Sequence, residues 1–530
     1  MSGRSRKITV KPVLAGVGLL LLAQVVYPQE MIGVVTGYHN GVWSGMINPA
    51  NPGTTRNYIH VNILAGDFFM QSDYFFVNKE DYRFSKLFSL NTEDPAYMHI
   101  YPYPEFTFID TVHYFDYRKD DAFRTMYGNM RIMGPSVMVH FGKHAVSLVT
   151  GFRNNFSFQD VPYDVANFIF RGQDFEPQHN ITYSGEDFGM GLLSWIELGL
   201  GYSYTVWKGM NSEINAGITV KGLLGTGGMH TSVQNVTYMV PNTDSIWFYD
   251  MNATVGLDLP MDYSDNDFPV FNPVIRGWGL GFDVGVTWSW IPGELPGGGF
   301  MAGPEEEPVE DHRLKVGLSL LDAGKITFNK AVQVHEFNNV DTALWSGLRT
   351  FHTESVQHLL RSASYNLLGD STASLTDKTS FYVYLPTALS LQGDYRIWDH
   401  FYASLTYVQG IHLGTPYVRR PALLALTPRY ETRNFAVNLP LSFYDFKYPQ
   451  IGLSLRFYNL IIGTEKLGTF LNLTDMTGLD LYFAIGFNLE PKDRDRMYKG
   501  QTKGRVGSCD SYQDYRRYQV KHKKYKGDGL

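Results

Sequence analysis

Residues 277–290 read "GWGLGFDVGVTWSW", in which every second side chain from Trp278 to Trp290 is large and apolar. The positions between them hold glycine, aspartate, threonine or serine. A period of two predicts a β-strand, because successive side chains of a strand point to opposite faces. A soluble sheet would turn the bulky face toward a protein core. A membrane barrel would turn it toward lipid and keep the small, polar face inside.

The rest of the chain favours the membrane barrel. The same alternation recurs in about fourteen segments, many of them reaching the roughly 9–11 residues that a tilted membrane strand needs. Aromatic residues make up 15% of the chain, as the aromatic girdles of such barrels require. The glycines between the bulky residues would leave room in the lumen for a plug, a loop or a substrate. The predicted strands cover residues 58–76, 134–141, 144–156, 193–207, 212–224, 229–240, 247–259, 276–291, 312–328, 382–397, 400–411, 433–445, 450–464 and 478–489.

The predicted fold class is therefore all-β, a transmembrane antiparallel β-barrel of about fourteen strands with long extracellular loops. An even number of strands returns the chain to its starting side, which is the periplasm for a bacterial outer-membrane barrel. This parity predicts short periplasmic turns at 142–144, 208–211, 241–246 and 398–399. It places the long connections 77–133, 157–192, 329–381 and 412–432 outside, and leaves 292–311 as one long periplasmic connection.

The longest loop contains a second kind of pattern. Apolar residues in 341–369 follow a helical stripe, which predicts a helix within the loop. Its simplest role is to cap the mouth of the barrel, and the alternative is to bind a partner.

Charged side chains in the predicted strands and their neighbours all lie on the polar face, so we predict that they line the lumen. A polar barrel interior is the simplest interpretation of this set, and a lipid-hydrolase site is the alternative. Such a site would need a Ser/His pair, and no spacing in the sequence indicates one. The predicted lumen-facing residues are Glu197, Glu213, Lys221, Asp250, Asp258, Asp283, Arg313, Lys315, Asp394, Arg396, Arg456 and Asp480.

No catalytic signature is present in the sequence. It contains no G-x-S-x-G elbow, H-E-x-x-H motif, P-loop or dinucleotide fingerprint. His352 and His358 are six residues apart, which suits neither one helical face nor a zinc pair. We therefore predict a protein that is not an enzyme and carries no cofactor and no metal.

The two ends of the chain differ from the barrel. Residues 1–29 combine a basic start with a short apolar run, which predicts a secretory signal peptide, the alternative being a membrane anchor helix. Cys509 is the only cysteine, so an exported protein would have no internal disulfide. Residues 491–530 carry 12 Lys/Arg against 5 Asp/Glu and lose all periodicity, which predicts a disordered periplasmic tail. Its densest basic cluster is Arg516, Arg517, Lys521, Lys523, Lys524 and Lys526.

A set of short motifs resembles a known group of barrels. "MINPANPG" (46–53) follows the signal peptide, and "LKVGLSLLDAGKITF" (314–328), "LPTALSLQGDYRI" (385–397) and "NLPLSFYDFKYPQIGLSLRFYNLIIGTEKLG" (438–468) follow in order. Together they resemble the PorP/SprF-like and related uncharacterised outer-membrane barrels of Bacteroidota. The resemblance implies a barrel tied to the type IX secretion and gliding apparatus. Asn48, Pro49 and Ala50 are also similar to a segment of the FadL-type fatty-acid channels, which implies that residues 30–57 lie inside the barrel.

Two functions follow from these observations. The first is a non-enzymatic component of a type IX secretion or gliding-type envelope machine. The second is a transport channel for a small or hydrophobic ligand. The predicted partners are outer-membrane lipid and, through the basic tail, an envelope or periplasmic protein, with no nucleic acid. In both cases the predicted organisation is a signal peptide (1–29), an N-terminal segment (30–57), an outer-membrane barrel (58–490) and the tail (491–530).

Overall fold

A computed structural model describes residues 31–79, 116–292 and 312–489, apart from the single positions 56, 121, 174, 271, 352 and 433. The predicted signal peptide and the basic tail lie outside the described residues. The chain divides into two units, Met1–Asn488 and Leu489–Leu530. The barrel belongs to the first unit, and its final strand ends one residue beyond that unit, at Leu489.

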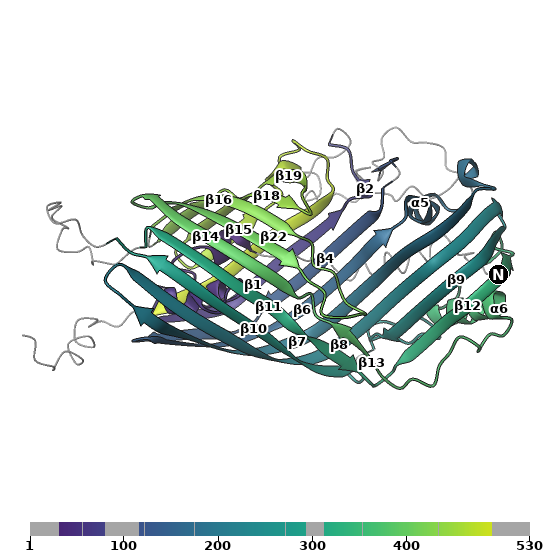
Figure 1. The fold of residues 1–530 in the computed structure, drawn as a ribbon, viewed down its shortest axis with the longest axis horizontal. Helices are drawn as coiled ribbons and strands as arrows, with labels where there is room; N and C mark the ends of the chain where they lie inside the picture. Colours follow the sequence, from purple (N-terminus) through teal and green to yellow (C-terminus); the bar gives the residue numbers. More distant parts are fainter. Residues whose placement is uncertain are drawn as a thin grey trace, which may run out of the picture. The chain divides into compact units, whose positions relative to one another are not determined.

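Fourteen strands form a closed antiparallel ring (Figure 1). Four of the fourteen are built from two consecutive pieces, and β22 pairs back with β1 to close the barrel. The fold class predicted from the sequence is confirmed. In ring order the strands are β1 (Ile59–Ser72), β4 and β5 (Arg124–Met133 and Ser136–Phe141), β6 (His144–Val161), β7 (Thr182–Lys208), β8 (Ser212–Asn242), β10 (Gly277–Trp290), β11 (Leu314–Phe328), β13 and β14 (Phe381–Tyr384 and Ala388–Trp398), β15 (Phe401–Gly410), β16 (Leu423–Glu431), β17 and β18 (Phe435–Asn438 and Leu441–Tyr444), β19 and β20 (Lys447–Ile451 and Leu453–Phe457), β21 (Leu460–Thr464) and β22 (Gly478–Leu489).

The two faces of β10 answer the question raised by its sequence. Trp278 is 62% exposed and Leu280 is 52% exposed, and the other bulky residues of the strand are exposed as well. Asp283 and Thr287, on the opposite face, are 3% and 1% exposed. A soluble protein would not leave such a continuous apolar face open, so the ring is a transmembrane barrel with its polar face inside.

The short connections gather at one end of the ring, which we call the short-turn end. The predicted turns near 142–144, 208–211 and 398–399 lie there, joined by the turns after β16 and after β20. The prediction at 241–246 is wrong. That turn joins β8 to β9 (Ser245–Asp258) at the opposite end, which we call the loop end, because β8 runs unbroken through 212–242.

The predicted number of strands agrees with the ring, but some of the predicted segments are not the strands that form it. The predicted strands 212–224 and 229–240 are one strand, and 247–259 corresponds to β9, which lies outside the ring. Two other strands replace them. One is β16, which lies within the predicted loop 412–432. The other is β21, which a turn at Tyr458 (φ 52°) separates from β20.

A local packing requirement explains the long β8. Its sequence "GTGG" (225–228) suggests a turn, but Gly225 and Gly228 instead make room for the ring of Phe328. An added Cβ would lie 2.8 Å from that ring at Gly225 and 2.3 Å at Gly228. The glycines therefore mark close packing inside a strand, not a break in it.

At the loop end the sheet extends beyond the ring. The outer half of β8 pairs with β9, and β9 pairs with β12 (Gln333–Ser346). Residues of α5 (Tyr163–Arg171) and α6 (Val356–Leu368) pack on this extension. Met251 and Ala253 of β9 lie in its buried core, so the expectation that this apolar face contacts lipid is wrong.

The helix expected within 341–369 is present as α6, although residues 333–346 form a strand. The side chain of Ser355 caps it by accepting a hydrogen bond from the backbone N–H of His358. Across the described ranges, no helix is both long and apolar enough to span a membrane.

Candidate functional site: the plugged lumen

Residues 31–55, which we call the plug, fold against the inner faces of the ring. They form two short helices and a 3-10 turn: α2 (Ile32–Val35), α3 (Gly41–Ser44) and η1 (Asn51–Thr54). Most of their side chains are buried, although helices this short have almost no stability of their own. Contacts with the wall therefore hold the plug in place.

Asn48 makes polar contacts both with the wall and within the plug. Its side-chain Nδ2 donates to Gln392 Oε1 at 2.9 Å and to the backbone oxygen of Val286 at 3.2 Å. Its Oδ1 accepts from the N–H of Ala50 at 2.9 Å. Ser203 on β7 donates to the backbone oxygen of Ala50 at 3.1 Å. Asn48 Nδ2 also lies 3.4 Å from the backbone oxygen of Leu318 on β11, so the Asn-Pro-Ala motif contacts four strands of the wall.

Three inner-face glycines form the seat of this motif. An added Cβ would lie 2.1 Å from Pro49 O at Gly217, 2.2 Å from Asn48 Oδ1 at Gly285 and 2.9 Å from Asn48 Nδ2 at Gly317. Gly217 and Gly285 are direct cross-strand partners on β8 and β10. Because any larger residue would collide with the plug, these glycines keep the wall open for it.

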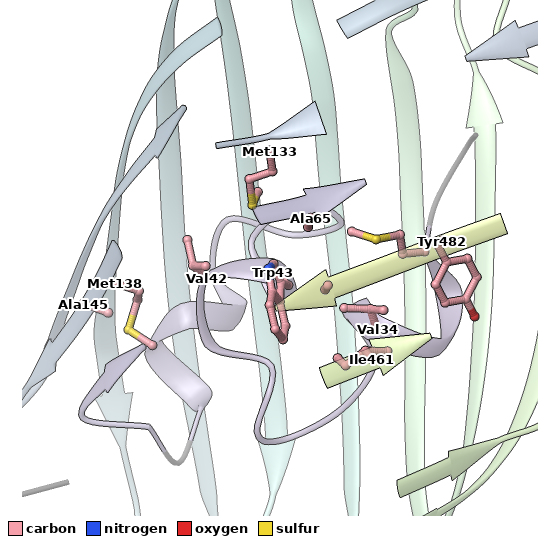
Figure 2. Close-up of a cluster of buried hydrophobic side chains, with 11 residues drawn as sticks. Val34, Val42, Trp43, Ala65, Met133, Met138, Ala145, Ile461 and Tyr482 are labelled. Carbon is pink, nitrogen blue, oxygen red and sulfur yellow. The ribbon is translucent and has the colours of Figure 1, made fainter. Parts of the chain in front are cut away.

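The other side of the plug is apolar. Met31, Val34, Val42 and Trp43 pack against buried side chains of the wall, among them Tyr482 (Figure 2). Trp43 also donates from Nε1 to Asn62 Oδ1 of β1 at 2.9 Å, so its one polar group is satisfied. This cluster supplies the hydrophobic part of the plug's attachment.

Two wall carboxylates bind backbone N–H groups of the plug. Glu465 accepts from Ile32 N at 3.1 Å, and Glu431 accepts from Tyr38 N at 3.1 Å. Arg456 and Arg429 pair with Glu431 at 3.2 and 3.0 Å and so hold it in position. With two arginines beside it, Glu431 makes a charge-assisted hydrogen bond to the plug, which is stronger than a neutral one.

A cavity with an empty volume of about 520 Å³ lies between the plug and β11, β14 and β15. His312 donates from Nε2 to Asp394 Oδ2 at 3.0 Å, and the hydroxyl of Tyr38 contacts the same ring. Burial lowers the pKa of His312, against the opposing effect of Asp394, and favours the neutral ring. Lys315 reaches from β11 to Thr54 Oγ1 at 2.8 Å.

A second cavity, of about 620 Å³, lies between the plug and β4 to β8, beside a cluster of buried charges. Arg153 binds Asp322 through two nitrogens at 2.7 and 2.9 Å and Glu197 at 3.2 Å. Lys221 binds Asp283 and Asp322, each at 2.7 Å. Paired in this way, the charges can remain inside the barrel.

The structure brings most of the predicted lumen residues to the inner face. Glu197, Lys221 and Asp283 meet in the buried cluster, and Asp394 joins Arg456 in the group around Arg429 and Glu431. Asp480 accepts from Glu465 N at 2.5 Å. Three more predicted residues lie at inner-face positions. Glu213 accepts a hydrogen bond from Asn215, and Lys315 donates one to Thr54. Arg396 is half-buried on the same face of β14 as Asp394.

Three predicted lumen residues lie elsewhere. Asp250 is exposed on β9, outside the ring, because that strand belongs to the loop-end sheet. Arg313 precedes β11 and lies over the ring of Tyr395, 5.1 Å from its centroid, and Tyr395 is exposed on the outer face. Asp258 is fully buried and pairs with Arg276 at 3.0 Å. The pair lies at the point along β8 where its neighbouring strand changes from β9 to β10.

Several site residues escaped the sequence prediction. Arg153 follows the alternation of its own strand, so the rule applied to the other strands would have found it. Asp322 breaks the alternation, because it lies at a β-bulge with φ 54° and is buried together with its neighbour Leu321. The "LDAG" sequence at 321–324 was the one local sign of that bulge. The basic cluster of the tail lies outside the described residues.

Within the part of the chain that the structure describes, no three His, Cys, Asp or Glu side chains are placed to hold a metal ion. The absence of enzymatic activity remains a prediction.

Fold and site together define a transmembrane β-barrel with a plugged lumen. The chain belongs to the Family of unknown function (DUF5723), whose model matches residues 49–465. That match begins at Pro49 of the plug and includes the ring as far as β21. A search of curated proteins found no match.

Three solved structures align over most of this chain. A Pseudomonas aeruginosa FadL homologue is 11% identical over 88% of this chain and 99% of its own, with a TM-score of 0.39. The Ralstonia pickettii toluene transporter TbuX is 9% identical over 88% and 99%, with a TM-score of 0.37. A mutant of the TodX monoaromatic hydrocarbon channel is 7% identical over 87% and 98%, also at 0.37. These scores lie below 0.5, so the fold stated above rests on the strand pairing of this chain. None of these matches is a PorP/SprF-like protein.

Proposed function

We propose that this protein is an outer-membrane transport channel for a small or hydrophobic ligand, closed at rest by the plug. The observation that carries the proposal is the way residues 31–55 are held. The plug is bonded to the wall from several sides, yet it is a separate segment of chain with a cavity on either side. A segment of this kind can be displaced without breaking the ring, because every ring strand is paired with its neighbours.

The experiment is single-channel recording of the purified barrel in planar bilayers. The full mature chain is expected to be closed for most of the recording. A variant lacking residues 31–55 is expected to conduct continuously, because water would fill the part of the lumen that the plug occupies. Heat-modifiable gel mobility shows whether the variant has formed a barrel. A folded variant that stays closed would contradict the proposal.

The second candidate is the envelope-machine component, such as a part of a type IX secretion or gliding apparatus. What favours it is the charge of residues 491–530, which carry 12 Lys/Arg against 5 Asp/Glu. Such a tail would attract acidic surfaces with a strength that depends on salt. Deleting residues 491–530 should leave membrane insertion intact and remove co-purifying envelope proteins. If the same proteins co-purify with the truncated chain, the tail does not dock them.

A further inference from the structure

The loop between β15 and β16 folds into the barrel. It covers residues 411–422, which we call the strap. Its two ends lie close together, because a Cβ added at Gly410 would lie 2.2 Å from the backbone oxygen of Arg420. Val418 and Arg420 are only 2% and 7% exposed. A hairpin between neighbouring strands needs only about two to five loop residues, so the additional length of the strap serves contacts elsewhere in the barrel.

The strap is bonded to a strand on the other side of the ring. Ser157 of β6 accepts a hydrogen bond from the backbone N–H of Arg419 at 3.0 Å, and Gln159 of β6 donates one to the backbone oxygen of Tyr417 at 3.2 Å. In ring order, β6 is separated from β15 by β7, β8, β10, β11 and the β13–β14 strand, and from β16 by the six remaining strands. A segment that connects β15 and β16 and also contacts β6 therefore crosses the lumen.

The strap also packs closely against β7, the strand beside β6. A Cβ added at Gly191 would lie 2.7 Å from the backbone oxygen of Tyr417, so this glycine makes room for the strap. Val418 lies in the same buried apolar cluster as Leu193 of β7. These contacts hold the strap against the far wall.

Other contacts fix the strap near its own strands. Tyr384 of β13 donates its backbone N–H to the backbone oxygen of Pro416 at 3.0 Å. Arg420 binds Asp322 of the buried charge cluster at 3.3 Å. The strap is thus held at both sides of the lumen and at the charge cluster.

The strap and the plug cross the lumen at different levels. Along β8 from the short-turn end, Gly217 seats the plug, Lys221 belongs to the charge cluster, and His230 is the cross-strand partner of Gly191, which the strap contacts. The strap therefore stays in the path after the plug has left. One segment of chain covers a chord of the ring and not its whole cross-section, so the strap narrows the path and the plug closes it.

From these contacts we infer that the strap is the constriction of the channel, the narrowest point that a solute passes once the plug has moved. The inference rests on the proposed function and adds the element that selects solutes by size and charge. Arg419 carries the charge at this point. Its side chain is 26% exposed and lies 3.2 Å from Asp160 and 3.5 Å from Asp445. A charge at the narrowest part of a pore acts on every ion that passes.

The first test is single-channel recording of barrels that lack residues 31–55, with and without a shortened strap. Residues 412–419 are replaced by two glycines, which can join ends that already lie close together. The unit conductance is expected to rise about twofold or more, because pore diameter limits what a channel passes. Heat-modifiable gel mobility shows whether each barrel has folded. An equal unit conductance in the two folded barrels would overturn the inference and leave the channel standing.

The full mature chain with the same shortened strap is the control for the plug. It is expected to stay closed for most of the recording, because its plug is intact. Continuous conduction by this chain would show that the strap closes the channel and would overturn the inference. If removal of residues 31–55 yields conduction only together with the shortened strap, the strap remains the constriction and the plug is not the sole closure. No conduction by any of these barrels would refute both the channel and its constriction.

A point substitution tests the same inference without shortening the loop. In the barrel that lacks residues 31–55, Arg419→Gln removes one cation at the strap and leaves Asp160 and Asp445 in place. The reversal potential in a KCl gradient is expected to shift toward a greater preference for cations. Arg313→Gln makes the same change of charge beside Tyr395 on the outer face, and its reversal potential should equal that of the parent barrel. Equal reversal potentials for the two variants would overturn the inference.

Discussion

Replacing Gly217 with alanine tests whether steric fit seats the plug. The new Cβ would lie 2.1 Å from Pro49 O and 2.5 Å from Ala50 N, both backbone atoms that cannot rotate away. An ordinary van der Waals contact needs at least 3.4 Å between the two atoms. Pro49 O must therefore move about 1.3 Å away from the new Cβ, the difference between 3.4 Å and 2.1 Å. The wall is fixed by strand pairing on both sides of β8, so the retreat falls on the plug. Overpacking of this kind costs about 1–3 kcal/mol, here borne by the closed state alone.

The open population should rise by the corresponding factor, about 5-fold to 150-fold. Single-channel recording measures it as the fraction of time spent conducting. Gly199→Ala is the matched control, because Gly199 lies on the inner face of the adjacent strand and its Cβ would meet Thr219 at an ordinary 3.5 Å. If folded Gly217→Ala barrels conduct no more often than Gly199→Ala barrels, the steric seat does not hold the plug closed.

Three further substitutions test other parts of the account. Leu280→Arg should cost about 2–4 kcal/mol in folding into vesicles, because it places a charge in lipid, whereas Gly199→Ala on the inner face, whose Cβ would meet Thr219 at an ordinary 3.5 Å, should fold normally. Equal losses would mean that the two faces are misassigned. Trp43→Ala should cost the plug's attachment about 3–5 kcal/mol and make its backbone sensitive to protease with the ring intact, and unchanged protection would contradict the role of this side chain. Asp322→Asn should destabilise the barrel by about 3–5 kcal/mol and lower the temperature of its gel-mobility shift, and an unchanged temperature would mean that the cluster is not structural.

The outer face of the barrel was predictable because lipid-facing positions obey one local rule. A residue that faces lipid must be apolar whatever its neighbour, so Trp278 and Leu280 identified their face without knowledge of any partner strand. The glycines of the inner face were equally informative. Gly285 predicted a void that something must fill, and the occupant is Asn48.

The remaining features depend on contacts between residues far apart in the sequence. Gly225 and Gly228 suggested a turn because nothing nearby in the chain reveals that Phe328 packs on them. Met251 sits in an alternating strand that looks lipid-facing, but its true neighbours are helices of the loop end. Asp322 is displaced by a bulge that is defined only by its pairing with β10. Strand pairing and packing partners, which periodicity alone does not encode, account for each of these differences.

The proposed channel opens only if the plug moves away from the wall, and a reversible disulfide between plug and wall tests this requirement. A Cβ added at Gly53 of the plug would lie 3.5 Å from Ser203 Cβ on the wall, within the roughly 3.5–4.5 Å that separates the Cβ atoms of a disulfide, so cysteines at positions 53 and 203 can be cross-linked once Cys509 is changed to serine. The measurement is single-channel conductance of the Gly53→Cys/Ser203→Cys barrel before and after reduction, with each single-cysteine barrel as a control. The oxidised barrel is expected to stay closed, and reduction is expected to restore the conducting events of the cysteine-free chain. Conducting events in the oxidised, fully cross-linked barrel, as frequent as those after reduction, would contradict it.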